Sequence, residues 1–193
     1  MSDRDLLVEL LVRRSVRFGD FVLASGRRST YYIDARLTTM SGEGQALLGR
    51  TALEALDQEG WRPDAVGGLT LGADPVSYSI AHAAALAGRA IDAFTVRKEP
   101  KAHGTGRLIE GPFRAGMDVV VVEDVVTSGE SALRAISAVE EAGGRVLGVL
   151  TVVDREEGGR ERLTEAGYRL VSLTTASGLL AAAGSAGSTR TTG

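Results

Sequence analysis

Apolar residues in this chain occur either in short unbroken runs or at helical spacing, and the two patterns alternate. Leucines at 6, 7, 10 and 11 predict an amphipathic helix over 3–15. Runs of Val, Ile and Leu predict strands at 65–69, 91–97, 119–123, 145–153 and 168–173. Helices are expected between them, over 41–58, from Pro75 to about 87, over 131–142 and near 160–166. Strands alternating with helices predict an α/β fold whose mostly parallel central sheet is flanked by helices.

Residues 18–34 interrupt this alternation. They are typical of two short strands joined by a turn at Ser25 and Gly26, with Tyr31 and Tyr32 in the second strand. Such a hairpin can form a hood over a ligand. The same pattern also fits a plain edge hairpin whose aromatic residues pack into the core.

The stretch 119–131 carries the most specific chemistry. Four consecutive valines favour a strand buried on both faces, and Glu123 and Asp124 follow at its carboxyl end. A small-residue loop then leads to Ser131, which is placed to cap the next helix. Open parallel sheets bind ligands at the carboxyl ends of their strands, so the acids suit sugar hydroxyls or a metal, and the loop suits a phosphate. The alternative is a buried strand followed by an ordinary turn.

The segment 98–110 is rich in breakers and polar residues, so we expect a mobile loop. Of the 22 basic residues only Lys98 and Lys101 are lysines, and His103 lies beside them. Lysine is a compact charge on a flexible stem and suits a mobile phosphate contact. A solvated loop without function is the alternative.

Three polar clusters, at 70–74, 123–131 and 154–157, follow predicted strands. They would therefore lie at the same edge of the sheet, together with the loop after Arg97. Their convergence indicates a binding site more strongly than any one cluster does.

Composition narrows the class of protein. With 193 residues, 44% of them hydrophobic, we expect one globular domain over 1–183, including a hood over about 1–40, and a disordered tail over 184–193. The net charge of −3 argues against nucleic-acid binding, and the chain has no cysteine for disulfides or thiolate metal sites. A charged N-terminus and the absence of long apolar runs favour a cytoplasmic protein that does not interact with membranes.

Several stretches together resemble the orotate phosphoribosyltransferases, a family with the type I phosphoribosyltransferase fold. Residues 123–131, E-D-V-V-T-S-G-E-S, match the motif by which type I enzymes bind phosphoribosyl diphosphate. The segments 21–34, 67–76, 96–104 and 154–159 are more specific for the orotate enzymes, above all V-R-K-E-P-K-A-H-G at 96–104. The resemblance spans residues 5 to about 180, and it implies that 5-phosphoribosyl 1-diphosphate and orotate give orotidine 5′-monophosphate and diphosphate in pyrimidine (UMP) synthesis.

The resemblance also implies roles for individual residues. It places the ribosyl donor on Arg97, Lys98, Lys101, His103, Glu123, Asp124, Val125, Val126, Thr127, Ser128, Gly129, Glu130 and Ser131. Lys101, Asp124 and His103 would be catalytic. Orotate would meet Thr127, Arg155, Tyr31 and Tyr32. Mg²⁺ is the implied cofactor, held mainly by substrate oxygens rather than by a direct protein ligand.

The family pattern further implies a homodimer in which the loop 97–110 is shared across the interface, and often a non-proline cis peptide, here near 69–72. Ala24 and Leu71 stand where many relatives have lysine, so two diphosphate or orotate contacts of those relatives are missing here. Two alternatives remain. One is a phosphoribosyltransferase for a purine or another base, and the other is a non-catalytic regulator that senses phosphoribosyl diphosphate.

Overall fold

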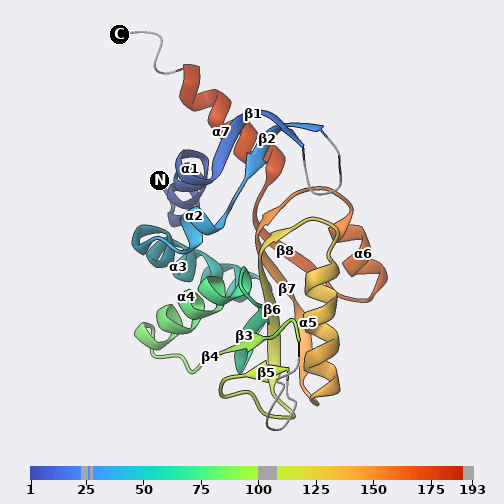
Figure 1. The fold of residues 1–193 in the computed structure, drawn as a ribbon. Coiled ribbons are helices and arrows are strands. Elements are labelled where there is room, and N and C mark those ends of the chain that lie inside the picture. Colours follow the sequence, from blue (N-terminus) through green and yellow to red (C-terminus); the bar gives the residue numbers. More distant parts are fainter. Residues whose placement is uncertain (23–25, 27, 100–107, 189–193) are drawn as a thin grey trace.

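The computed structural model describes residues 1–22, 26, 28–99 and 108–188. Its centre is a six-stranded sheet with the order β5-β4-β3-β6-β7-β8 (Figure 1). The strands are β3 (Ala65–Leu69), β4 (Asp92–Val96), β5 (Ile109–Glu110), β6 (Asp118–Val126), β7 (Arg145–Asp154) and β8 (Leu170–Thr175). Within the described ranges every pairing in this sheet is parallel except that of β4 with β5. The predicted α/β fold with a mostly parallel sheet is confirmed.

Helices cover both faces of the sheet (Figure 1). One face carries α1 (Asp3–Ser15), α3 (Gly42–Gln58), α4 (Ala73–Leu86) and α7 (Ala176–Ser188), and the other carries α5 (Glu130–Glu141) and α6 (Gly159–Glu165). Val120 and Val122 pack into the first core, whereas Val119 and Val121 pack into the second. The unbroken valine run of β6 thus supplies both cores, because successive side chains of a strand point to opposite faces.

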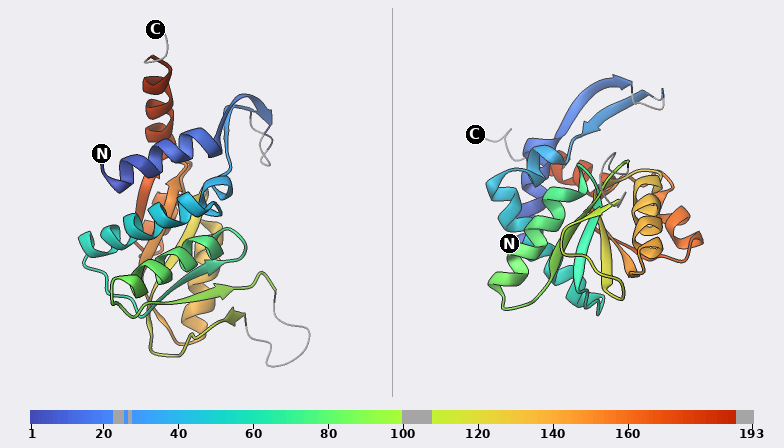
Figure 2. Two further views of the ribbon diagram at one scale, coloured as in Figure 1. Left: turned by 90° about the vertical axis from the view of Figure 1, so that its left-hand side faces the viewer. Right: turned by 60° about the horizontal axis from the view of Figure 1, so that its bottom comes forward.

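The predicted hairpin is present as β1 (Val16–Val22) and β2 (Arg28–Ile33), which pair antiparallel. It follows α1 and stands away from the main sheet (Figure 2). Alternation along β2 sends its two tyrosines to different surroundings. Tyr32 packs on Phe21 at 5.7 Å between ring centroids, whereas Tyr31 packs against the core and the guanidinium of Arg155.

Several element boundaries differ from the predictions. Strand β6 continues to Val126, so Glu123 and Asp124 lie inside the strand rather than after it. Residues 109–110, expected in the loop, form the antiparallel strand β5. Ser131 does not cap α5, because the N-cap is Gly129 in a left-handed conformation with φ 75°, and no side chain caps that helix. Helix α3, by contrast, is capped by a side chain: the hydroxyl of Ser41 accepts from the N–H of Gly44 at 3.1 Å.

Two helices were not predicted. The four residues of α2 (Arg36–Thr39) are too few to show a period. Helix α7 extends through residues 184–188, which the composition assigned to a disordered tail, while 189–193 lie outside the described residues. Its small-residue sequence resembles a low-complexity segment, yet Leu179 is fully buried in the first core. Burial of a few apolar side chains outweighs the weak local signal.

Candidate active site

The loop 127–131, between β6 and α5, forms a small polar cavity. It has a volume of about 350 Å³ and is lined by Glu123, Val125, Val126, Thr127, Ser128, Gly129, Glu130, Ser131 and Arg134. Because no side chain caps α5, the N–H groups of its first turn remain available to an anion. Helix α6 packs closely against the loop, because a Cβ added to Gly159 would lie only 2.5 Å from the carbonyl oxygen of Thr127. The loop predicted to hold a phosphate, called the cradle below, therefore forms a polar cavity beside the uncapped N-terminus of α5.

Glu123 is a buried carboxyl group on the wall of this cavity. Its residue is only 5% exposed, and its Oε1 atom has no hydrogen-bond partner. Burial, and to a lesser degree the charge of Asp124, raises the pKa of Glu123 to about 8. In a polar cavity such an oxygen is available to a hydrogen bond from a bound ligand or from water.

Asp124 faces a different neighbour. Burial raises the pKa of its carboxyl group. Two neighbours oppose that rise: the N–H of Val125, which donates to Oδ1 at 2.9 Å, and the charge of Arg36. The turn after β3 lies directly against this carboxylate. A Cβ on Gly72 would be only 2.3 Å from Oδ1 of Asp124, so only glycine allows the turn to come this close. The turn 70–74 and the acids of β6 thus meet, as predicted from their positions at strand ends.

Hydrogen bonds hold the turn 70–74 in place. Asp74 accepts from the hydroxyls of Thr70 at 2.7 Å and Thr95 at 2.8 Å, and the N–H of Thr70 donates to Val96 O at 2.8 Å. The peptide bond between Thr70 and Leu71 is cis, within the range implied by the family pattern. Leu71 is 53% exposed.

The base of the predicted flexible loop lies at the same sheet edge. The N–H of Arg97 donates to Leu108 O at 2.8 Å, which extends the pairing of β4 with β5. Arg134, which lines the cradle, donates to the carbonyl oxygen of Lys98 at 3.1 Å. Two of the predicted loop residues, Lys101 and His103, lie outside the described residues, so their positions stay predictions.

A second cavity lies beneath the hairpin. It measures about 400 Å³ and is lined by Arg28, Ser29, Tyr31, Arg155, Glu156, Glu157, Ala176, Ser177 and Leu180. The guanidinium carbon of Arg155 lies 5.3 Å from the centroid of the Tyr31 ring, a cation–π contact. The N–H of Arg155 donates to Val126 O at 2.9 Å, which places this cavity beside the cradle.

The structure therefore separates the four residues predicted to meet orotate. Arg155 and Tyr31 line the second cavity, and Thr127 lines the cradle. Tyr32 is not among the lining residues of either cavity and instead packs on Phe21. Sequence reasoning missed Glu157 and Ser177, which line the second cavity. Glu157 could have been noticed because it lies two residues after a candidate arginine.

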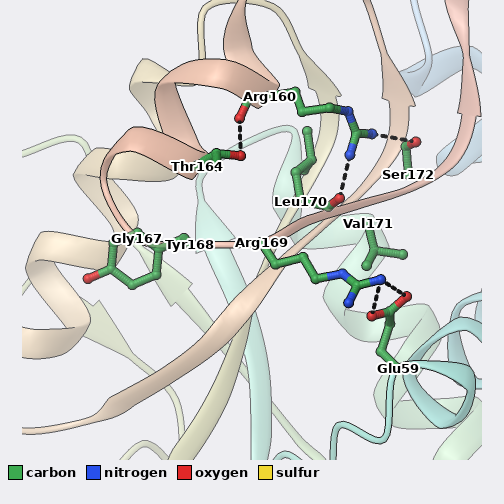
Figure 3. Close-up of a pocket in the computed structure, with 9 residues that line it drawn as sticks. All are labelled: Glu59, Arg160, Thr164, Gly167, Tyr168, Arg169, Leu170, Val171 and Ser172. Atoms are coloured by element: carbon green, nitrogen blue, oxygen red, sulfur yellow. Dashed lines mark hydrogen bonds and ion pairs between the residues drawn. The ribbon is translucent and has the colours of Figure 1, made fainter.

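A third cavity, of about 570 Å³, opens where α6 and β8 face Glu59 (Figure 3). Its arginines already have partners. Arg160 donates to Leu170 O at 2.7 Å and to the Ser172 hydroxyl at 3.1 Å, and Arg169 lies 2.9 Å from the Glu59 carboxylate. These side chains are satisfied without a ligand, unlike Glu123 in the cradle.

Neither a metal cluster nor a membrane-spanning helix is found among the described residues. No group of three or more His, Cys, Asp or Glu side chains there could hold a metal ion. No described helix is both long enough and apolar enough to cross a bilayer.

A parallel sheet with an anion cradle after an acidic strand end and a second cavity beneath a hairpin hood is the architecture of a type I phosphoribosyltransferase. Consistent with it, a family model described as a phosphoribosyl transferase domain matches residues 43–170. The orotate phosphoribosyltransferase of Aquifex aeolicus is 47% identical over 183 residues, covering 93% of this chain and 99% of that relative. The corresponding enzyme of Mycobacterium tuberculosis H37Rv is 50% identical over 171 residues, covering 89% and 93%.

A crystal structure of the Mycobacterium tuberculosis H37Rv enzyme in complex with 5-phospho-α-D-ribosyl 1-diphosphate is similar as well. It has a TM-score of 0.78 and 45% identity, over 92% of this chain and 98% of that chain. The chain belongs to the orotate phosphoribosyltransferase family.

The raised pKa of Glu123 predicts how stability depends on pH. The folded protein holds this proton up to a pKa of about 8, whereas the unfolded chain releases it near the ordinary glutamate pKa of 4.5. The free energy of unfolding should therefore fall as pH rises from about 5 to 8, and this group should account for a decrease on the order of 3 kcal/mol. Glu123→Gln should remove that loss, so the variant gains on wild type as pH rises.

Urea unfolding of both proteins at several pH values between 5 and 8 checks this expectation. Glu161→Gln, an exposed residue on α6, is the control and should follow wild type. Parallel curves for wild type and Glu123→Gln would show that the carboxyl group ionises normally.

Proposed function

We propose that this protein transfers the phosphoribosyl group of 5-phosphoribosyl 1-diphosphate to orotate, giving orotidine 5′-monophosphate and diphosphate in pyrimidine synthesis. A bond forms between a ring nitrogen of orotate, whose N–H proton is released to solvent, and the anomeric carbon, as the bond from that carbon to diphosphate breaks and its electron pair leaves with diphosphate. One observation carries the proposal: the N–H of Arg155 bonds to Val126 O at 2.9 Å, which joins a cationic, aromatic cavity to an anion cradle.

The cradle is suited to the 5′-phosphate of the donor. The open first turn of α5 and the hydroxyls of Thr127, Ser128 and Ser131 offer donors to phosphate oxygens. Glu123 and Asp124 would accept from ribose hydroxyls. The negative charge of Asp124 would also stabilise the positive charge that develops on the ribosyl carbon as diphosphate departs.

The second cavity is suited to the base. Orotate carries a carboxylate, and the guanidinium of Arg155 is the side chain best matched to a planar carboxylate. Tyr31 can wall one face of the pyrimidine, because its ring already covers the guanidinium at 5.3 Å. Orotate therefore fits this cavity better than an uncharged base does.

Mg²⁺ fits this site as a cofactor held largely by the substrate. A hard cation of this kind is commonly bound by one or two carboxylates together with phosphate oxygens and water. Glu123, whose Oε1 atom lacks a partner, lines the cradle, and Asp124 follows it in β6, so these are the carboxylates that would lie closest to such an ion. When bound, Mg²⁺ would neutralise charge on the diphosphate.

Arg97, Lys98, Lys101 and His103 would neutralise the leaving diphosphate, and closure of their loop would exclude water from the reacting carbon. We expect Lys101→Ala to lower kcat about 10²-fold, because it removes one cation that stabilises the departing group. Steady-state kinetics at saturating substrates measure this change. Arg169→Ala is the control, because Arg169 makes an exposed ion pair with Glu59. A wild-type kcat for Lys101→Ala would remove this residue from the mechanism.

A homodimer with a shared loop is part of the proposal. Four large apolar residues stay exposed around α2 and α4, which pack together: Leu37 on α2, Met40 directly after it, Leu71 in the turn before α4, and Tyr78 on α4. Such a surface suits a second copy of the chain. Sedimentation equilibrium tests the dimer.

If the loop acts on the partner's site, mixing Lys101→Ala with Asp124→Asn should restore about a quarter of wild-type activity. Half of the randomly formed dimers would then contain one variant of each kind, and each of these dimers has one intact site out of two.

The decisive experiment follows orotate by ultraviolet absorbance after donor and Mg²⁺ are added. Absorbance should fall only when all three are present. Uracil, hypoxanthine and xanthine, tested side by side with the same donor, separate this activity from that of the purine enzymes. Donor binding without turnover of any base would favour a regulator. The proposed cytoplasmic location is tested by cell fractionation.

A further inference from the structure

Arg155 does not stand free in its cavity. Its side chain is only 6% exposed, and the carboxylate of Glu157 lies beside it. One oxygen of that carboxylate, Oε1, accepts from Nε of Arg155 at 3.1 Å and from Nη2 at 2.8 Å. Glu157 thus holds one edge of the guanidinium, while the Tyr31 ring lies over its face.

The backbone that carries this pair is itself fixed. The buried carboxylate of Asp154 accepts from Nε of Arg160 at 3.0 Å and from the N–H of Glu156 at 2.9 Å. Figure 3 shows how Arg160 is in turn anchored to β8 through Leu170 and Ser172.

The next residue ties the same loop to α7. Glu156 has a φ of 57°, rare for a residue with a side chain, and its carboxylate accepts from the N–H of Ser177 at 2.8 Å and from the Ser177 hydroxyl at 3.0 Å. A short loop fixed by these four hydrogen bonds gives Arg155 and Glu157 little freedom to move as a unit. The orientation of the guanidinium then depends on Glu157.

A guanidinium group has five N–H donors, and Glu157 takes two of them. Within the described residues, no hydrogen bond is made by Nη1 of Arg155. Three donors therefore remain, at Nη1 and on the outer side of Nη2. These donors form the second edge of the guanidinium, which can receive a planar carboxylate through two parallel hydrogen bonds.

We infer that Glu157 is a positioning residue: it turns Arg155 so that the free edge of the guanidinium meets the carboxylate of the base. This inference rests on the proposed function. Glu157 acts through Arg155 and does not touch the substrate. It makes the site selective for a carboxylated pyrimidine over one without the carboxylate, because only the former uses the oriented edge.

The opposite role would be competition, in which Glu157 occupies Arg155 until orotate displaces it. Removing a competitor strengthens orotate binding, whereas removing a positioning residue weakens it. The two roles therefore predict opposite signs for the same substitution.

The test compares two product nucleotides by calorimetry, using the full chain. Orotidine 5′-monophosphate and uridine 5′-monophosphate differ only in the carboxylate, so the ratio of their Kd values isolates the contact with Arg155. Glu157→Ala should reduce the preference for orotidine 5′-monophosphate about 10- to 100-fold, the range for losing a hydrogen bond to a charged group. Affinity for uridine 5′-monophosphate should not change, which also controls for folding.

Two further variants separate position from charge. Glu157→Gln keeps an oxygen at the Oε1 position and should recover most of the preference, whereas Glu157→Asp keeps the charge but is one methylene shorter and should not. Glu59→Ala, which breaks the exposed pair with Arg169, is the control and should behave as wild type. Orotate KM should follow the nucleotide preference across the series, with the donor KM constant.

The outcomes distinguish this inference from the proposed function. A wild-type protein that binds both nucleotides equally and transfers nothing to orotate overturns the function itself. A wild type that prefers orotidine 5′-monophosphate, with Glu157→Ala unchanged or tighter, overturns only the role of Glu157. If Glu157→Asp keeps the preference for orotidine 5′-monophosphate and Glu157→Gln loses it, Glu157 supplies its charge rather than a position for Arg155, and the inference is overturned.

Discussion

Replacing Asp124 by asparagine should lower kcat/KM for the donor about 10³-fold, because the amide cannot stabilise the positive charge that develops on the ribosyl carbon. The fold should persist. Burial already raises the pKa of this carboxyl group, so a neutral side chain of the same shape costs little in the folded state. The N–H of Val125 can still donate to the amide oxygen, as it now does to Oδ1 at 2.9 Å.

Initial rates with varied donor at saturating orotate measure the loss, and urea unfolding checks the fold. Asp92→Asn is a matched control, since Asp92 is exposed at the opposite end of the sheet, where β4 begins. If Asp124→Asn keeps more than about a tenth of wild-type kcat/KM, Asp124 is not the group that stabilises the charged carbon.

The sheet and the cradle could be predicted because their signals are local. An unbroken valine run followed by two acids and a small-residue loop indicates a central strand that ends at a phosphate site. Nothing beyond residues 119–131 is needed for that prediction. The same local reasoning placed α1 and β3 with the boundaries that the structure has, and α3 to within one residue.

Other parts of the site depend on contacts between distant segments. The close approach of Gly72 to Asp124 joins the turn after β3 to the middle strand, and nothing in either segment alone encodes it. Alternation along β2 could have separated Tyr31 from Tyr32, but which tyrosine faces the cavity depends on how the hairpin docks. Strand β5 has only two residues, so its identity comes from pairing with β4 rather than from its own pattern.

In the proposed function, the two cavities recognise different parts of the substrates, and one short connection joins them. The cradle belongs to the loop after β6 and the base cavity to the loop after β7, and these neighbouring parallel strands end in register, Val126 opposite Asp154. Changes in the second loop should therefore alter base selection without altering the grip on the phosphate. This separation allows the role of Arg155 to be tested independently of the donor.

Arg155→Ala should raise the KM for orotate and lower kcat/KM for orotate about 10²- to 10³-fold, while the KM for the donor stays near wild type. The guanidinium is almost fully buried, so its pairing with a carboxylate is poorly screened, and truncating one partner of such a pair typically costs several kcal/mol. The loss should be smaller for uracil as acceptor, because uracil offers no carboxylate.

The measurement is a pair of saturation curves, one for each substrate, on wild type, Arg155→Ala and Arg155→Lys. Lysine keeps the charge but loses the planar fork, so it should recover only a minor part of the orotate affinity. Arg169→Ala is the control for loss of an arginine outside the site. An unchanged orotate KM in Arg155→Ala, or a donor KM that rises equally, would mean that the cavity beneath the hairpin does not bind the base. The carboxylate would then have to be recognised elsewhere along the edge where β6 and β7 end.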